Sequence, residues 1–434
     1  MLPETLRQWL DTATAQLRCR RAAPAVREEL ESHLAEQYHA LRQAGEPEKQ
    51  AARKTVQSMG DAVQVGVSLD AVHRPRPAWG LAAVLAVIMV LARLLWLCTG
   101  VEMPLITLVP AVAVLAVAVQ WGDVSRLARH GTALYGIYSI CLIVFASWPG
   151  AYTVSGRVQH AEALCMLLVP LYALAVYAWK GRGLLGLLAC CALLLPGVSA
   201  CLFMPLMAGV IQLCLAALAL GIYCCAKDWF GCGKKRSFAC LFLVVLGLAG
   251  GAAIFLWTKG IGFSAYEKRV FALFHPMADP HGAGYFPLLL RDVWQGGDGL
   301  GASREQLASL LADFPMTYWF CRLGAGPMLL ACGALLGCLA MLGMAALRIR
   351  NAAGRLLAIS CAVLFPFQLL SNLLAGAGLL PYRLSLPFMG GAGTVCMQAA
   401  IAGLLLSAFR YDTMPAPPEE GAGKKRLHLS LEWR

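Results

Sequence analysis

The sequence predicts an all-α, polytopic membrane protein with about ten transmembrane helices and a small helical domain at its N-terminus. Three observations support this fold class. The 434 residues are 59% hydrophobic and only 14% charged, whereas a soluble domain carries about 25% charged residues. The apolar residues form repeated runs of about 18–23, the length of a helix that crosses a bilayer. Basic residues gather in alternate loops between these runs, as the positive-inside rule requires.

Residues 1–77 are expected to form a cytoplasmic helical bundle. The apolar residues of its second helix stand three or four positions apart, which places them on one face: Val26, Leu30, Leu34, Tyr38 and Leu41. Gly60-Asp61 separates a third helix from a short fourth one, in which Gly66 is unfavourable. This domain holds 11 basic and 10 acidic side chains, so the net charge of +12 lies mainly elsewhere. We therefore expect no nucleic-acid partner.

The membrane domain is predicted over residues 78–410, with a cytoplasmic tail at 411–434. One long polar loop, 258–316, interrupts it, and loops of this length are usually functional. Free cysteines behave as small hydrophobes, and the 17 cysteines show no metal-ligand spacing. The apolar segments are about 79–98, 104–121, 132–148, 161–178, 184–201, 204–225, 238–257, 317–346, 356–377 and 390–409.

The loops between these segments fall into two sets by charge. One set is basic: Arg126 and Arg129; Lys180 and Arg182; Lys227, Lys234, Lys235 and Arg236; Arg348, Arg350 and Arg355. The other short loops hold only Arg157 and Arg383. The positive-inside rule then predicts that both termini are cytoplasmic and that the loop 258–316 is outside.

Two stretches carry resemblances to known families. Val26-Arg-Glu-Glu-Leu-Glu-Ser-His-Leu, followed by Ser58-Met-Gly-Asp61 and Leu69-Asp-Ala-Val-His-Arg-Pro-Arg-Pro77, resembles the permease prefix domain. Such a domain is expected to be regulatory or an adaptor. The last two-fifths of the chain resembles the SEDS family (shape, elongation, division and sporulation) of the FtsW/RodA/SpoVE type.

The SEDS resemblance rests on the order and spacing of several motifs together with the ten-helix topology. Arg269-Val-Phe, Pro276, Asp279-Pro280, Gly282 and Gly284-Tyr285 resemble the start of the large outer loop of the family. The glycines at 296, 297, 299 and 301 resemble its glycine-rich turn. Gln368-Leu-Leu-Ser-Asn372, Gly378-Leu-Leu-Pro381 and Leu386-Pro-Phe388 resemble the segment that leads into the last outer loop.

The resemblance implies a function in bacterial cell-wall assembly. SEDS proteins are glycosyltransferases of the plasma membrane that polymerise lipid II, an undecaprenyl-linked precursor, into peptidoglycan strands. They work with a class B penicillin-binding protein, which supplies the transpeptidase. The expected partners of this chain are therefore a lipid-linked precursor, such a transpeptidase and membrane lipid, in cell shape, division or sporulation.

The chain departs from the family pattern at several functional positions. Gln159-His-Ala-Glu162 keeps the Gln and Glu of a family motif, but the Lys position falls on Cys165. The Gln-Pro-Asp motif keeps only Pro205. The catalytic Asp of the family, at the entrance to the eighth helix, reads Thr317. The last motif is one residue short around Arg383.

Glycosyl transfer from a lipid pyrophosphate needs a base for the attacking hydroxyl and positive charge on the leaving group. Asp313, one helical turn before Thr317, is the candidate catalytic base. The candidate substrate-binding residues are Glu162, Arg269, Asp279, Gln368 and Asn372. The alternatives are solvated carboxylates and, for the two amides, hydrogen bonds between helices. A divalent cation on the pyrophosphate is the one cofactor considered.

Three functions remain open at this point. The first is a divergent peptidoglycan glycosyltransferase, favoured by the outer-loop motifs. The second is an inactive or regulatory relative that binds the precursor, favoured by the loss of the family Asp and Lys. The third is a lipid II flippase or transporter, for which the paired broken helices of inverted repeats are not evident.

Overall fold

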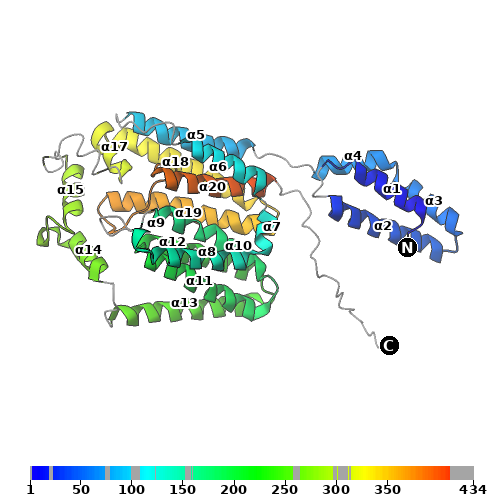
Figure 1. Ribbon diagram of the computed structural model, residues 1–434, viewed down its shortest axis with the longest axis horizontal. Helices are drawn as coiled ribbons and strands as arrows, with labels where there is room; N and C mark the ends of the chain where they lie inside the picture. The colour runs from blue at the N-terminus through cyan, green and yellow to red at the C-terminus, as the bar shows by residue number, and fades with distance from the viewer. Residues whose placement is uncertain are drawn as a thin grey trace. The chain divides into compact units, whose positions relative to one another are not determined.

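The computed structural model describes residues 2–18, 23–73, 79–98, 108–122, 124–151, 158, 160–257, 264–296, 301, 311 and 314–410. These residues divide into two compact units, one within residues 1–77 and one within 78–409 (Figure 1). Asp313 and Asp298, and Gln159 of the Gln-x-x-Glu motif, lie outside the described residues.

The N-terminal unit is the expected bundle of helices. It consists of α1 (Glu4–Ala15), α2 (Ala23–Gln43), α3 (Glu48–Met59) and α4 (Ala62–His73). Leu6, Leu10 and Leu34 are fully buried in its own core. Gly66 lies where α4 passes close to α1, because a Cβ there would collide with the carbonyl oxygen of Ala13. The glycine is therefore explained by close helix packing.

The membrane unit contains a helix, or a pair of helices, at every apolar segment expected from the sequence. The described elements between residues 79 and 257 are α5 (Trp79–Cys98), α6 (Leu108–Trp121), α7 (Val124–Arg129), α8 (Gly131–Ala146), the 3-10 turn η2 (Pro149–Ala151), α9 (Ala161–Met166), α10 (Leu168–Ala178), α11 (Gly183–Phe203), α12 (Met207–Ala226) and α13 (Lys234–Trp257). After the long loop come α18 (Ala325–Leu347), α19 (Ala352–Gly376) and α20 (Ala392–Arg410).

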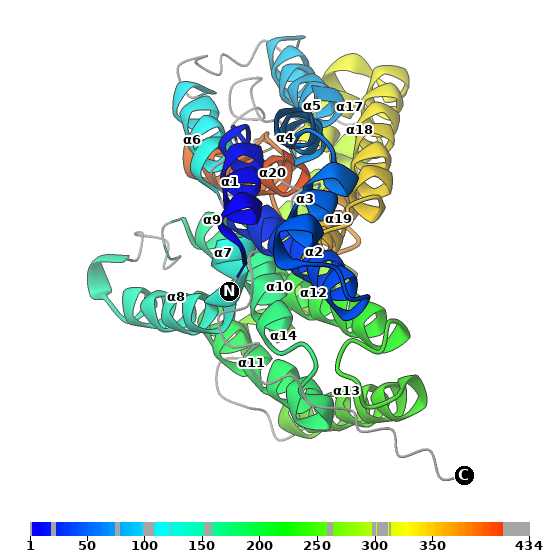
Figure 2. The same cartoon turned by 90° about the vertical axis from the view of Figure 1, so that its right-hand side faces the viewer.

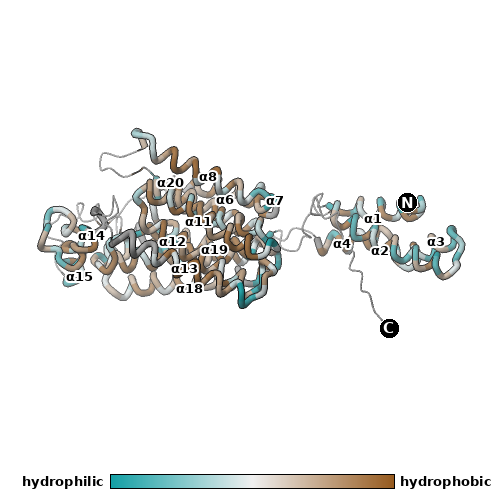
Figure 3. Tube along the Cα trace, turned by 90° about the horizontal axis from the view of Figure 1, so that it is seen from below, coloured by the Kyte–Doolittle hydropathy of each residue, from teal (hydrophilic) through white to brown (hydrophobic). Residues whose placement is uncertain are grey.

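The helices form layers with α10, α12 and α19 at the centre. α19 packs against α10, α12 and α18, and α18 in turn packs against α5. α11 and α13 lie on the other side of α12 (Figure 1 and Figure 2). Six helical stretches among the described residues are long and apolar enough to cross a membrane, and the tube coloured by hydropathy is apolar along most of this unit (Figure 3). The predicted all-α polytopic membrane fold is confirmed.

The long polar loop contains helices of its own. They are α14 (Ser264–Phe274), the 3-10 turn η3 (Pro276–Ala278), α15 (Tyr285–Trp294) and the start of α17 (Pro315–Leu323). The prediction of a single apolar segment over 317–346 is wrong, because it is two helices, α17 and α18. Gly324 separates them with a φ of 84°, a conformation that glycine adopts without steric cost.

Two basic loops meet at one end of the membrane unit, and the long polar loop meets the end of α19 at the other (Figure 1). At one end the amide of Gly181 donates to the carbonyl of Trp229 at 3.1 Å, which joins two basic loops. The long loop meets the last loop at the other end, where the Trp294 indole donates to the Gly376 carbonyl at 2.7 Å. The charge pattern therefore corresponds to a real division between two ends.

Candidate functional site

Glu162 lies at the start of α9, where the chain turns through a strained residue. His160, immediately before α9, has a φ of 55°, which is rare for a residue other than glycine. The half-buried Glu162 carboxylate accepts two hydrogen bonds from one residue of the last loop. The Ser385 amide donates to Oε1 at 2.5 Å and the Ser385 hydroxyl donates to Oε2 at 2.9 Å. Both carboxylate oxygens are therefore held in place.

Arg383 supplies positive charge beside this carboxylate. Its guanidinium lies close enough to Glu162 for electrostatic attraction. The same group lies over the ring of Phe314, 5.2 Å from the ring centroid, in a cation–π contact. Phe314 directly precedes α17, so Arg383 joins the last loop to the end of the long loop. An arginine beside a carboxylate at a loop junction is suited to contact a phosphate.

Buried amides continue the site into the helices. Gln368 and Asn372 are fully buried on α19, one turn apart. The Asn372 side chain donates to the Leu384 carbonyl at 2.8 Å, within the same loop as Arg383. The Gln368 oxygen accepts from Gln398 of α20 at 3.1 Å. Gln368 thus bonds to a neighbouring helix, as the alternative of hydrogen bonds between helices expects, whereas Asn372 bonds to the last loop.

Gln398 also holds the far side of the last loop. Its oxygen accepts from the backbone amide of Phe388 at 2.6 Å. Phe388 has a φ of 61°, and a bulky residue in that region costs of order 1–3 kcal/mol. The loop between α19 and α20 is thus fixed at Leu384, Ser385 and Phe388, with a strained residue maintained by its neighbours.

Thr317, at the position of the family Asp, is part of the packing. Its side chain is 1% exposed, and its hydroxyl donates to the Gly376 carbonyl at 3.0 Å. That carbonyl also accepts from Trp294, so three elements, α15, α17 and α19, meet at one oxygen. The Thr317 hydroxyl therefore closes the end of α19.

The two outer-loop candidates are exposed. Arg269 has an exposed side chain on α14. Asp279 is exposed, and its carboxylate accepts from the Ala283 amide at 2.9 Å within its own turn. A Cβ on Gly282 would collide with the same carboxylate. Asp279 and this glycine thus form a tight turn that leads into α15.

The sequence analysis missed two residues of the site. Ser385 was not considered, because nothing in its local sequence distinguishes it from other loop serines. Gln398 carried a usable signal, since a polar side chain within a membrane segment is costly and usually has a partner or a role. Arg383 was noted as a loop charge and as the place where the last motif is one residue short, without a role in the site.

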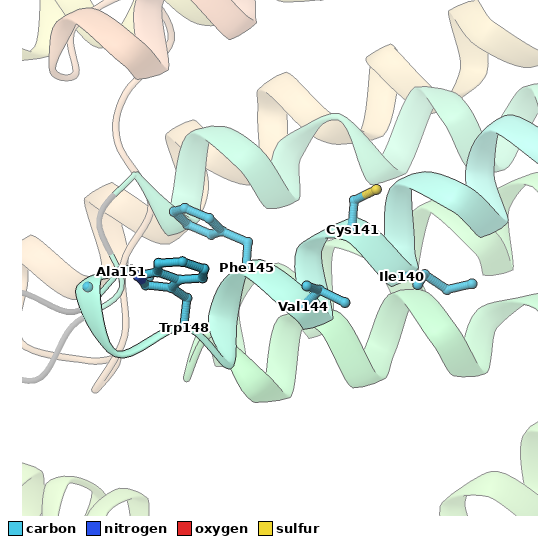
Figure 4. Close-up of a pocket in the computed structure, with 7 residues that line it drawn as sticks. Ile140, Cys141, Val144, Phe145, Trp148 and Ala151 are labelled. Carbon is cyan, nitrogen blue, oxygen red and sulfur yellow. The ribbon is translucent and has the colours of Figure 1, made fainter.

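The structure gives no metal cluster among the described residues, and a pocket on α8 lies outside this site. Among the described residues no group of three or more His, Cys, Asp or Glu side chains could hold a metal ion. The divalent cation on the pyrophosphate stays a prediction. A shallow pocket of about 530 Å³ runs along α8, lined by apolar side chains such as Ile140, Val144 and Trp148 (Figure 4). It shares no residue with the polar site.

The chain is similar to proteins of known name. No protein-family model matches it. It is 32% identical over 200 residues to the probable peptidoglycan glycosyltransferase FtsW of Pseudoalteromonas atlantica, covering 43% of this chain and 40% of that protein. It is 29% identical over 199 residues to the protein of the same name from Trichlorobacter lovleyi, covering 40% and 51%. The chain thus spans about two-fifths to one-half of the length of these relatives.

A solved structure shows the same fold. A chain from a structure described as a peptidoglycan synthase complex that coordinates polymerization and crosslinking superposes with a TM-score of 0.57. The two chains are 22% identical, and the match covers 77% of this chain and 98% of that one. The fold is therefore that of this solved chain, and the sequence is similar to the FtsW proteins over about two-fifths of its length.

Proposed function

We propose that this chain is a SEDS-type peptidoglycan glycosyltransferase of a bacterial plasma membrane, acting on lipid II or a related undecaprenyl-linked precursor. One observation carries the proposal: Glu162, at the start of α9, and Arg383 lie together where the long and last loops meet. The FtsW relatives, whose names state peptidoglycan glycosyl transfer, support the assignment.

Arg383 is the group we assign to the leaving pyrophosphate. Its fork of donors fits a phosphate, and a cation placed there stabilises the charge that develops as the glycosidic bond breaks. Glu162 and Ser385 hold the loop that presents this arginine. The arginine would take the place of the cation lost at Cys165, which is buried among sulfur atoms and 3.5 Å from Met204 Sδ.

Asp313 is the base we assign to the attacking sugar hydroxyl. It directly precedes Phe314, whose ring lies beneath Arg383. A carboxylate near the phosphate site can take the proton as the new glycosidic bond forms. Glu162 is the competing candidate, because its carboxylate lies close enough to Arg383 for electrostatic attraction.

We further propose that this end of the molecule faces outward and that both termini are cytoplasmic. The basic loops at the opposite end support this orientation. A class B penicillin-binding protein is the proposed partner, supported by the fold shared with a chain of a peptidoglycan synthase complex.

Polymerisation of labelled lipid II by the purified chain, alone and with its transpeptidase partner, tests the proposal. We expect Arg383→Ala to slow polymerisation about 100-fold, since one transition-state donor contributes about that much. Asp313→Ala should lose about 100-fold or more. Arg350→Ala removes an exposed charge from a basic loop and should keep full activity. No polymer under any condition would refute the enzymatic function, and polymer made by Asp313→Ala would exclude that base.

A second function is favoured by one observation: the position of the family Asp is a buried threonine bonded to the helix end. The chain would then bind the precursor without polymerising it. In that case the purified chain binds labelled lipid II, Arg383→Ala weakens the binding, and no polymer forms. Movement of lipid II across proteoliposomes, absent from empty vesicles, would instead indicate a flippase.

A further inference from the structure

Two basic loops of the membrane unit are joined to each other. The first connects α10 to α11, and the second connects α12 to α13. The Gly181 amide donates a hydrogen bond to the Trp229 carbonyl at 3.1 Å, and the Gly183 amide donates to the Phe230 carbonyl at 2.8 Å. Because both bonds are between main-chain groups, they hold the two loops together whatever their side chains contact.

The joined loops and the first turn of α13 form a strongly basic surface. We call residues 179–183 and 227–236 the basic surface. Its one acid, Asp228, accepts a hydrogen bond from the Gly233 amide at 2.9 Å within its own turn. None of the ion pairs among the described residues includes a cation of this surface, so its positive charge is available to attract an anion. Six cations are exposed on it: Lys180, Arg182, Lys227, Lys234, Lys235 and Arg236.

Aromatic rings fix the positions of two of these cations. The Lys180 ammonium lies over the Trp229 ring, 5.2 Å from its centroid, and the Arg182 guanidinium lies 4.5 Å from the centroid of the Trp179 ring. The Trp179 indole donates in turn to the Thr132 hydroxyl of α8 at 3.1 Å. An aromatic ring attracts a cation without neutralising its charge. Both side chains can therefore still donate hydrogen bonds to an anion, and they lose less freedom when they do so.

The basic surface lies where membrane-spanning helices end. Two helical stretches that are long and apolar enough to cross a membrane, Ala161–Ala178 and Gly183–Phe203, end and begin on either side of its first loop. Directly after this loop, Leu185 of α11 is 76% exposed. On α13, Phe238 and Phe242 are 40% and 67% exposed. The helices α11, α12 and α13 lie next to one another (Figure 1). Exposed cations are thus followed along these helices by exposed apolar side chains.

This arrangement favours one class of ligand. A molecule with a phosphate and hydrocarbon chains contacts both the cations and the apolar side chains, whereas a soluble anion contacts the cations alone. Trp179 and Trp229 favour the same ligand, because tryptophan is enriched at the interface between membrane and water. We propose that the basic surface binds an anionic phospholipid, with Lys180 and Arg182 at its phosphate and its acyl chains along α11 and α13.

The lipid site is separate from the proposed glycosyl-transfer site. It shares no residue with the contacts of Glu162 and Arg383, and it takes part in no step of the proposed chemistry. Lipid binding is measured without the precursor, so a negative result leaves the proposed function untouched.

Native mass spectrometry of the full chain in detergent provides the test. Phosphatidylglycerol is titrated, and the affinity for the first bound lipid is compared with that for the uncharged phosphatidylcholine. We expect phosphatidylglycerol to bind about tenfold more tightly. Lys180→Gln combined with Arg182→Gln should weaken its binding about 25-fold, because each basic side chain at an anionic lipid contributes about fivefold. The affinity of this double variant for phosphatidylcholine should stay the same.

Two further double variants separate this site from general charge and from loop structure. Arg348→Gln combined with Arg350→Gln removes two exposed positive charges from the loop between α18 and α19, and should leave the affinity unchanged. Lys234→Gln combined with Lys235→Gln should weaken the binding of phosphatidylglycerol. It leaves the two described ring contacts of the loops intact, so its effect does not arise from their loss.

Three outcomes would overturn the proposal. The first is equal weakening by the control at 348 and 350 and by the variants of the basic surface, since any charge on the protein would then serve. The second is equal affinity for phosphatidylglycerol and phosphatidylcholine. The third is displacement of the bound lipid by an equal concentration of glycerol phosphate, which has the phosphate without the acyl chains and would identify a site for soluble anions.

Discussion

At the scale of single residues, the site is defined by two contacts of Glu162, one with Ser385 and one with Arg383. Glu162 is held by Ser385, and Arg383 provides the nearby cation. Of these residues, only Glu162 belongs to a motif that resembles the family pattern. Thr317, in contrast, contributes to stability through a hydrogen bond to a helix end. Glu162 and Arg383 thus supply the charges of the site, whereas Thr317 stabilises the packing of the helices around it.

Ser385→Ala should destabilise the membrane unit by about 1–2 kcal/mol, since one hydrogen bond to a carboxylate is lost while the amide still donates. The melting temperature in detergent measures this change. Ser371→Ala is a suitable control, because its hydroxyl bonds only the carbonyl of its own helix, at Gln368. An equal loss in both variants would contradict a special role for the contact between Ser385 and Glu162.

Substitutions at Thr317 should differ sharply. Thr317→Val should cost only about 1 kcal/mol, because the Gly376 carbonyl keeps its bond from Trp294. Thr317→Asp brings a carboxylate against that carbonyl in a buried position, and should cost about 3 kcal/mol or more. Thermal unfolding compares the two. If the aspartate is tolerated as well as the valine, the threonine is not a packing residue.

At the scale of elements, the end of α19 is where the long loop is attached. The α15 and α17 helices both reach the Gly376 carbonyl, and the last loop starts directly afterwards. The break at Gly324 allows α17 to lie across this end while α18 crosses the membrane unit. Hydropathy could not reveal the break, because both helices are apolar enough to read as one segment.

Gly376→Ala should loosen this attachment. The added Cβ would lie 2.5 Å from Thr317 Oγ1, so α17 must shift, at a cost of about 1–3 kcal/mol. Gly337→Ala on α18 is the matched control, because its Cβ meets no atom within 4 Å and alanine favours a helix. Hydrogen exchange of α15 and α17 should rise in the first variant only. Unchanged exchange in both would show that the close contact is not required.

At the scale of the whole molecule, the two units have separate hydrophobic cores. Leu34 belongs to the first core and Leu369 to the second. Leu34→Ala should destabilise the N-terminal unit by about 2–5 kcal/mol while leaving the membrane unit unchanged. Hydrogen exchange followed separately in α2 and α19 measures both. A parallel loss of protection in α19 would indicate that the units unfold together.

The orientation of the membrane unit is also a property of the whole chain. A green fluorescent protein fused after Gly181 should fluoresce, because the positive-inside rule predicts that this basic loop is cytoplasmic. Alkaline phosphatase fused after Gly296 should be active, because the long loop is predicted to be outside. The reverse pattern would invert the proposed topology.

Much of the fold followed from the sequence, and much of the site did not. The apolar segments coincide with helices, and the bundle of α1 to α4 appears where its periodicity predicted it. Among the candidates, Gln368 and Asn372 are on one buried face as expected, and Glu162 lies beside a cation. Arg269 and Asp279 are exposed, and Asp313 lies outside the described residues. Loop residues were hard to rank, because no periodicity constrains them.

The sequence by itself determined the membrane class and the positions of most helices, because hydropathy and helical hydrogen bonds are local along the chain. Only the tertiary structure decided that Ser385 holds Glu162 across 223 positions and that Arg383 lies over Phe314. It also decided that Thr317 closes a helix end. Such contacts depend on how whole helices pack against each other, and side-chain packing over long sequence separations leaves no local pattern to read.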